Sequence, residues 1–175
     1  KKYEANDILM NFVDNHDENS WNGTIQSRLG AAEEAMTALT YVMPGMPLVY
    51  SGNEYGLNHS LKFFEKDSIP KVKGKDWELR AKLGQLKKDN PALNGGKNPA
   101  GFNRINTSSD STILAFEREK EGKKVIYIAN LSKTNQKVKL EISGTFTNFM
   151  TNEKVTLSEG KEISLQPWQY YIVTN

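Results

Sequence analysis

Residues 8–20, ILMNFVDNHDENS, place a short apolar run directly before a cluster of polar side chains. The run ILMNFV has the length and composition of a buried strand. Apolar or small residues then recur at intervals of four and three, the spacing of one helix face. These residues are Ile25, Leu29, Ala32, Met36, Leu39 and Met43. In residues 44–54, PGMPLVYSGNE, Pro44-Gly45 ends the helix and PLVY forms a second buried strand.

This order of strand, helix and strand predicts a βαβ unit. Neither strand alternates between apolar and polar residues, as is typical of a parallel sheet covered on both faces. Residues 52–75 show no periodicity and are expected to form a long loop. A second helix is predicted from an N-cap at Asp76 to the sequence Asp89-Asn90-Pro91. Its buried face would consist of Leu79, Leu83 and Leu86.

The character of the chain changes after about residue 92. Turn residues appear between residues 94 and 101, and the helical period ends. Four segments then carry β-branched and aromatic residues between turns, which predicts an antiparallel β-sandwich. They are TILAFERE, KKVIYIANL, QKVKLEI and EISLQPWQYYIVTN. The sequence therefore predicts an α/β plus all-β chain, with one domain at residues 1–91 and a second at residues 92–175.

Composition excludes several classes of partner. The 23 Lys and Arg residues against 21 Asp and Glu give a net charge of +2, so no nucleic acid partner is expected. No stretch approaches the roughly 20 apolar residues of a membrane span. The first residues contain too short an apolar run for a signal peptide. Without cysteine, the sequence fits a reducing or an oxidising compartment, and localisation stays open.

The polar residues 14–19 are the candidate site, because barrel enzymes place catalytic groups after parallel strands. Turn formation and helix capping explain such residues about equally well. A metal site would use His16 with Asp14, Asp17 or Glu18. Neighbours on an extended strand point to opposite faces, so at most two could share an ion, and no metal is expected. A G-x-S-x-G elbow and a phosphate-binding loop are both missing, which favours paired carboxylates.

Three segments resemble alpha-amylase-type glycoside hydrolases. FVDNHD at residues 12–17 is similar to the family's motif at the seventh barrel strand, and PGMPLVYSGNE to its eighth strand. SLQPWQYYIV at residues 164–173 resembles the closing strand of the C-terminal sandwich. The resemblance implies the last two βα units of a TIM (β/α)8 barrel followed by an antiparallel sandwich. It also implies retaining hydrolysis of starch or maltooligosaccharide in a bacterial enzyme, secreted or periplasmic.

The resemblance assigns roles to particular residues. Asp17 matches the third active-site carboxylate, and His16 matches a histidine that donates to the same glucosyl unit. Asn15 is grouped with the substrate-binding residues, chiefly as a support for the loop. Trp21 is expected either to stack on a sugar or to be buried. Tyr50 and Glu54 are expected to make structural hydrogen bonds.

The extent of the chain limits what the resemblance implies. The nucleophile and general acid lie on earlier strands, and calcium sites usually lie upstream as well. Asp14 points away from Asp17 on an extended strand and Glu18 begins the loop, so neither replaces them. The isolated chain is therefore expected to be inactive as a hydrolase. We also expect self-association or loose packing of the first 91 residues, because missing units would leave apolar surface exposed.

Two further interpretations stay open. The first is a non-catalytic carbohydrate-binding or structural β-sandwich, which an exposed row of Trp168, Tyr170 and Tyr171 would favour. A buried row is the more common reason for such a pattern. The second is a parent enzyme that transfers or isomerises glucosyl groups, since the same motifs serve those activities.

Overall fold

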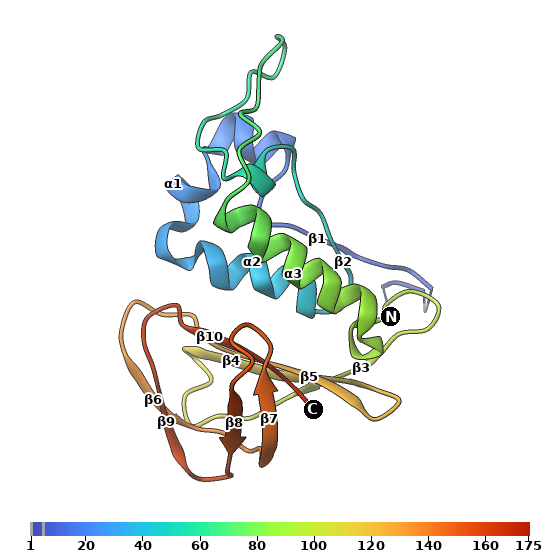
Figure 1. The fold of residues 1–175 in the computed structure, drawn as a ribbon, viewed down its shortest axis with the longest axis vertical. Helices are drawn as coiled ribbons and strands as arrows, with labels where there is room; N and C mark the ends of the chain where they lie inside the picture. The colour runs from blue at the N-terminus through green and yellow to red at the C-terminus, as the bar shows by residue number, and fades with distance from the viewer. Residues whose placement is uncertain (1, 5) are drawn as a thin grey trace.

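The computed structural model describes residues 2–4 and 6–175 of the chain. Figure 1 shows a helical part lying across one face of a β-sheet, with a long loop projecting away from the sheet. The N-terminal part contains one parallel strand pair, in which Met10 is aligned with Met46. Its elements are β1 Met10–Asn11, the π-helical turn η1 Glu18–Asn22, α1 Ile25–Leu29, η2 Gly30–Ala32, α2 Glu33–Val42 and β2 Met46–Pro47. They are followed by η3 Asn53–Tyr55, α3 Lys75–Asp89 and η4 Pro91–Leu93.

The remainder of the chain is almost entirely antiparallel β-structure. Six strands form a sheet in the order β3-β4-β5-β10-β7-β8, and β6 pairs with β9 in a second, two-stranded sheet. The strands are β3 Gly101–Arg104, β4 Ile113–Lys120, β5 Lys123–Asn130, β6 Gln136–Lys139, β7 Gly144–Asn148, β8 Lys154–Leu157, β9 Glu162–Leu165 and β10 Tyr170–Thr174. The predicted antiparallel sandwich is confirmed.

The expected barrel units are not evident as such. β1 and β2 comprise two residues each, where the sequence predicted runs of six and four. Among the described residues, these two strands pair only with each other. The observed arrangement is thus a parallel strand pair with a helical connection, beside a mainly antiparallel β-domain.

Two hydrophobic cores lie on opposite sides of the large sheet. The first joins α2 and α3 to the sheet, and includes Val42 and Leu83 from the helices with Phe116, Tyr127 and Ile172 from the strands. The second lies within the sandwich and includes Ile126, Ile128, Val138, Leu165 and Val173. Adjacent strand residues alternate between the two cores, as expected for a sheet covered on both faces. Three layers result: helices, the six-stranded sheet, and the β6-β9 pair.

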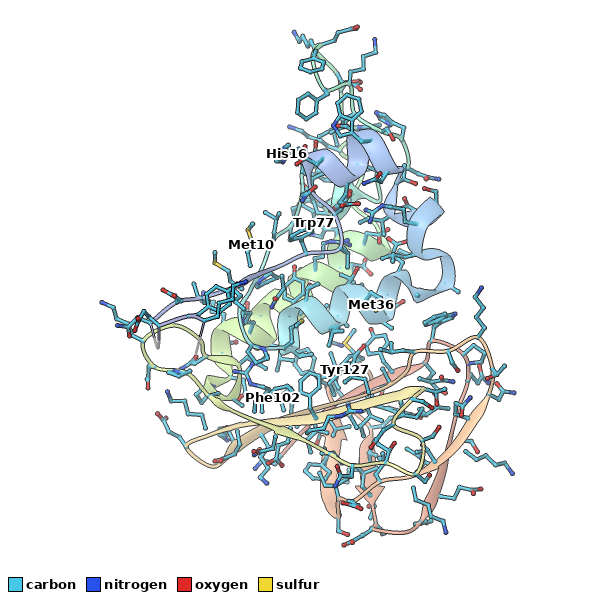
Figure 2. All side chains as sticks on the ribbon, turned by 180° about the vertical axis from the view of Figure 1, so that it is seen from behind. Met10, His16, Met36, Trp77, Phe102 and Tyr127 are labelled. Atoms are coloured by element: carbon cyan, nitrogen blue, oxygen red, sulfur yellow. The ribbon has the colours of Figure 1, made fainter. Side chains whose placement is uncertain are left out.

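Buried polar groups also connect the helices to the sheet. Arg118 in β4 is 1% exposed. Its guanidinium donates to the backbone carbonyls of Gly101 at 2.8 Å, Val42 at 3.1 Å and Asn94 at 3.0 Å. The Tyr127 hydroxyl donates to the Ala35 carbonyl at 2.7 Å, on the helix-facing side of the sheet seen in Figure 2. These bonds tie the polar atoms of the buried Arg118 and Tyr127 side chains to backbone carbonyls, as buried donors require.

Two local predictions differ from the structure. The helix expected from Ile25 to Met43 is interrupted by the 3-10 turn η2, because Gly30 adopts a positive φ of 51° that ends α1. The helix α3 begins at Lys75 with Gly74 as its N-cap, so Asp76 is not the cap. Asp76 instead lies in the first turn, where a negative charge stabilises a helix, and its carboxylate is 3.5 Å from Arg80 in the next turn.

Among the described residues, no helix has the length and apolar character needed to cross a membrane.

Candidate functional site

The candidate site begins where the chain leaves β1 and turns into a short helical segment. The Asn15 side chain accepts a hydrogen bond from the backbone N–H of Glu18 at 2.8 Å, which is the contact of a helix N-cap. The Asn15 carbonyl also accepts from the N–H of Asn19 at 2.9 Å. These contacts suit the expected supporting role of Asn15 in the loop.

His16 and Asp17 follow this cap and lie side by side. Their side chains are 64% and 62% exposed, and His16 Nε2 is 3.5 Å from Asp17 Oδ2. Figure 2 shows His16 at the end of the molecule farthest from the sandwich, close to the projecting loop. A carboxylate and an imidazole exposed together can accept and donate hydrogen bonds to the hydroxyls of a ligand. Their roles toward a substrate stay predictions.

The strand geometry that the sequence suggested for this cluster is wrong. Asp17 has helical dihedral angles, φ −74° and ψ −48°, so side-chain alternation does not apply to it. Asp14 is nevertheless separated from Asp17, because its side chain is buried. Asp14 accepts from Arg28 at 2.7 Å and from Asn53 at 3.1 Å. The carboxylate is therefore a structural group.

Arg28 organises the base of the site and was missed by the sequence analysis. Besides Asp14, its guanidinium donates to the carbonyls of Val13 at 2.9 Å and Gly23 at 3.1 Å. It also lies 3.7 Å from Glu18. A signal for this role exists, since Arg28 is the sole Lys or Arg between residues 3 and 61. A buried carboxylate in that stretch requires a cation, and Arg28 is the nearest in sequence.

Three aromatic side chains lie beside the polar pair. Trp21 is 62% exposed, Phe63 44% and Phe64 85%. Ring centroids are 5.5 Å apart for Trp21 and Phe63, and 4.8 Å apart for Phe63 and Phe64. The His16 ring centroid lies 6.0 Å from that of Phe63. We call Trp21, Phe63 and Phe64 the aromatic wall. The sequence pointed to Trp21 alone, because Phe63 and Phe64 lie in a loop without periodicity.

Tyr50 and Glu54 belong to the segment that follows β2. Glu54 Oε2 accepts from the Gly52 N–H at 3.0 Å, a structural bond of the expected kind. Burial, assisted by the negative charge of Asp14, raises the pKa of Tyr50.

No group of three or more His, Cys, Asp or Glu side chains that could hold a metal ion is found in the described ranges. His59, the second histidine, lies 3.7 Å from Asp67 in the projecting loop. It takes no part in the cluster around His16.

The aromatic residues at the end of the sandwich do not form an exposed row. Tyr170 packs on Tyr127 with ring centroids 6.1 Å apart, and its hydroxyl donates to Glu34 at 2.8 Å. Tyr171 packs against the second core. Trp168 is partly buried at a turn with a φ of 59°. This arrangement agrees with the core interpretation and gives no platform for a sugar.

The sandwich is similar to a domain of known proteins. Residues 103–172 match the family model described as Maltogenic Amylase, C-terminal domain. The match covers β3 to β10 almost completely. A search of curated protein sequences gave no match.

Solved structures of alpha-amylases share the fold of nearly the whole chain. A noncanonic maltogenic alpha-amylase from Thermotoga neapolitana aligns over 99% of this chain and 42% of its own, with 19% identity and a TM-score of 0.82. An alpha-amylase from Anoxybacillus aligns over 95% of this chain and 38% of its own, with 22% identity and a TM-score of 0.72. An alpha-amylase from Lactobacillus plantarum aligns over 99% and 40%, with 18% identity and a TM-score of 0.73.

The predicted resemblance to the C-terminal part of an alpha-amylase-type enzyme is confirmed. The chain spans about two fifths of the length of these structures. The similarity therefore covers the fold of a portion of such enzymes.

Proposed function

We propose that the chain is part of a retaining α-glucan hydrolase and contributes Asp17 as the third active-site carboxylate. The observation that carries this proposal is the exposed pair of His16 and Asp17 immediately beyond a parallel strand, in a chain with the fold of alpha-amylases. The substrate would be starch or a maltooligosaccharide. Transfer of glucosyl groups by the same site is an alternative that uses the same residues.

In this proposal Asp17 acts on the transition state more than on the ground state. Retaining hydrolysis uses a nucleophile and a general acid about 5 Å apart, through an oxocarbenium-like transition state. A third carboxylate that accepts from sugar hydroxyls stabilises the flattened, positively charged ring. His16 would donate to the same glucosyl unit. Asn15 would hold the helical turn that presents both side chains.

The nucleophile and general acid belong, in this proposal, to a longer polypeptide. Asp14 is paired with Arg28, and Glu18 lies within reach of the same guanidinium. Neither carboxylate is free to attack a sugar. The isolated chain would bind glucan without cleaving it. Any calcium would bind in the upstream portion, as in the relatives that the sequence resembles.

The N-terminal region would complete a barrel. We infer that β1 and β2 are the seventh and eighth strands, that residues 1–91 end the catalytic domain, and that residues 92–175 form the sandwich domain. Exposed apolar side chains on and beside these strands support this inference, since further strands and helices would cover them. They are Ile8, Leu9, Met10, Phe12, Met46 and Val49. The same surface is the basis for expecting the isolated chain to self-associate. A secreted or periplasmic location in a bacterium fits a polysaccharide substrate.

The test is hydrolysis by the complete polypeptide that contains this chain. Asp17→Asn should lower kcat for maltooligosaccharide by about 100-fold or more, with a smaller change in KM. Glu18→Gln is the matched control, because it also neutralises a carboxylate beside the site. Equal activity of Asp17→Asn and the parent enzyme would contradict the proposed role.

A further inference from the structure

The aromatic wall is exposed at a place where the surrounding chain is well fixed. Phe63 and Phe64 lie in the loop that projects from the molecule in Figure 1, after η3 and before α3. The N–H of Leu61 donates to Asn19 Oδ1 at 2.7 Å, and Ser20 Oγ donates to the Leu61 carbonyl at 3.2 Å. Asn19 is 1% exposed. The loop base is therefore bonded to η1, the same helical turn that follows Asp17.

The tip of the loop is also closed by hydrogen bonds. Asp67 accepts from the backbone N–H groups of Lys62 at 3.0 Å and Ser68 at 2.7 Å. These two bonds, followed by the charge of His59, lower the pKa of Asp67. The segment that carries Phe63 and Phe64 is thus closed by bonds to one carboxylate.

Two other surface aromatic groups, Trp77 and Phe102, each have a ring packed against another aromatic ring. Trp77 is stacked on Tyr55 with centroids 5.5 Å apart, and Lys73 Nζ lies 4.2 Å from the Trp77 ring. Phe102 is 47% exposed, but it lies against Phe116 at 5.0 Å. The aromatic wall differs because its members contact mainly one another and keep large exposed areas.

The wall is continuous with the polar pair. The His16 ring neighbours the Phe63 ring, and the Phe63 ring neighbours those of both Phe64 and Trp21. A pyranose ring has apolar C–H faces and a polar rim of hydroxyls, so it requires aromatic faces next to hydrogen-bonding groups. Asp17 and His16 supply the hydrogen-bonding groups on one side of the wall.

We propose that Trp21, Phe63 and Phe64 form an aromatic subsite that stacks on a glucosyl unit of an α-glucan, next to the unit contacted by Asp17 and His16. The inference rests on the proposed function, because the polar pair selects the ligand. It adds a substrate preference: a chain long enough to reach both groups binds more tightly than a short one. The loop of residues 59–68 thus sets substrate length.

The experiment is a titration of the 175-residue chain with maltose and maltoheptaose, followed by NMR. The indole N–H of Trp21 should shift with maltoheptaose, while those of Trp77 and Trp168 serve as internal references. Phe64→Ala and Trp21→Ala should each weaken maltoheptaose binding by about tenfold, the loss expected for one stacked ring. Both side chains are exposed, so neither variant threatens the fold. Phe102→Ala is the matched control and should bind like the parent chain.

The outcomes separate this inference from the proposed function. If Asp17→Asn weakens binding but Phe64→Ala and Trp21→Ala do not, the subsite is refuted and the proposed role of Asp17 stands. If only the aromatic variants weaken binding, the subsite stands and Asp17 loses its role. If no glucan binds and Phe64→Ala abolishes self-association in analytical ultracentrifugation, the wall is a contact between copies and the subsite is refuted. Absence of both binding and association also refutes it.

Discussion

The two halves of this molecule differ in how far their large apolar side chains are buried. From residue 92 onward, the strands bury their large hydrophobic residues in two cores, and Phe102 is the one large apolar side chain there that is strongly exposed among those described. Among the described residues up to Val72, eleven large apolar side chains are exposed. The sandwich therefore buries its large apolar side chains within the described structure, whereas the surface around β1, β2 and the projecting loop leaves them exposed. The candidate site lies on the second kind of surface.

Removing the helices should destabilise the β-domain more than any other change considered. A fragment of residues 92–175 would expose Phe116, Val125, Tyr127 and Ile172 on the face that α2 and α3 now cover. At about 1.5–3 kcal/mol for each of the four side chains, the free energy of unfolding would fall by about 6–12 kcal/mol. We expect an aggregation-prone fragment with a low urea midpoint. A fragment beginning at Gly30 is the control and should unfold cooperatively. A stable, monomeric 92–175 fragment would instead make the sandwich an autonomous domain.

Replacing Arg118 should be the most damaging single substitution. Arg118→Met would remove the donor that binds the carbonyls of Gly101, Val42 and Asn94, and the Val42 bond is fully buried. The free energy of unfolding should fall by about 3–5 kcal/mol. Arg104→Met is a matched control, because Arg104 bonds two carbonyls of β4 but is exposed. Urea denaturation should separate the two variants; similar losses would show that burial of Arg118 is unimportant.

Removing Asp14 should loosen the N-terminal region alone. Asp14→Ala deprives Arg28 and Asn53 of a buried partner, at a cost of about 2–3 kcal/mol. Amide exchange should accelerate in residues 12–29 and 52–57 and stay unchanged in β4 and β5. Glu18→Ala provides the comparison, since Glu18 is partly exposed and 3.7 Å from Arg28. Faster exchange throughout the sandwich would contradict the separation of the two regions.

Tyr170→Phe should have the smallest effect, and it depends on pH. The variant loses one hydrogen bond to Glu34, worth about 1 kcal/mol. Burial and Glu34 raise the pKa of Tyr170, and burial raises that of Tyr127. The stabilisation from neutral tyrosine is complete below the ordinary pKa of 10.0 and is lost as pH rises above it.

The alkaline loss provides the measurement for Tyr170. Between pH 8 and pH 11, the urea midpoint should fall less in Tyr170→Phe than in the parent chain. Tyr3→Phe is the control, because Tyr3 is 50% exposed and should leave the alkaline loss unchanged. An equal alkaline loss in all three proteins would place the titrating group elsewhere.

Periodicity predicted the parts of the fold that are stabilised by regular burial. The strands around Ile113, Ile126 and Ile172 and the helix containing Leu83 alternate or repeat as the sequence suggested. Periodicity did not predict where helices end. The apolar period continues from Ile25 to Met43, but Gly30 ends the first helix within it. Asp76 also shows that a carboxylate near the start of a helix can form an ion pair with a residue of the next turn, here Arg80, instead of capping the helix.

The candidate site could be found from sequence only where a motif carried it. His16 and Asp17 were singled out by FVDNHD and are adjacent in the structure. Their helical conformation was not predicted, because the preceding apolar run suggested that the strand continued. Phe63 and Phe64 could not be placed beside His16 from the sequence, because long-range hydrogen bonds bring the loop there: the Leu61 N–H donates to Asn19, and Ser20 donates to the Leu61 carbonyl.

The helix layer shared by both halves also limits how such proteins can exchange parts during evolution. A recombination event near residue 91 would transfer a sheet without α2 and α3, and would separate Arg118 from the Val42 carbonyl that it binds. A crossover near Gly30, before α2, would carry the helices together with the strands they cover. We therefore expect successful module swaps, natural or engineered, to begin ahead of α2 rather than at the start of the β-domain.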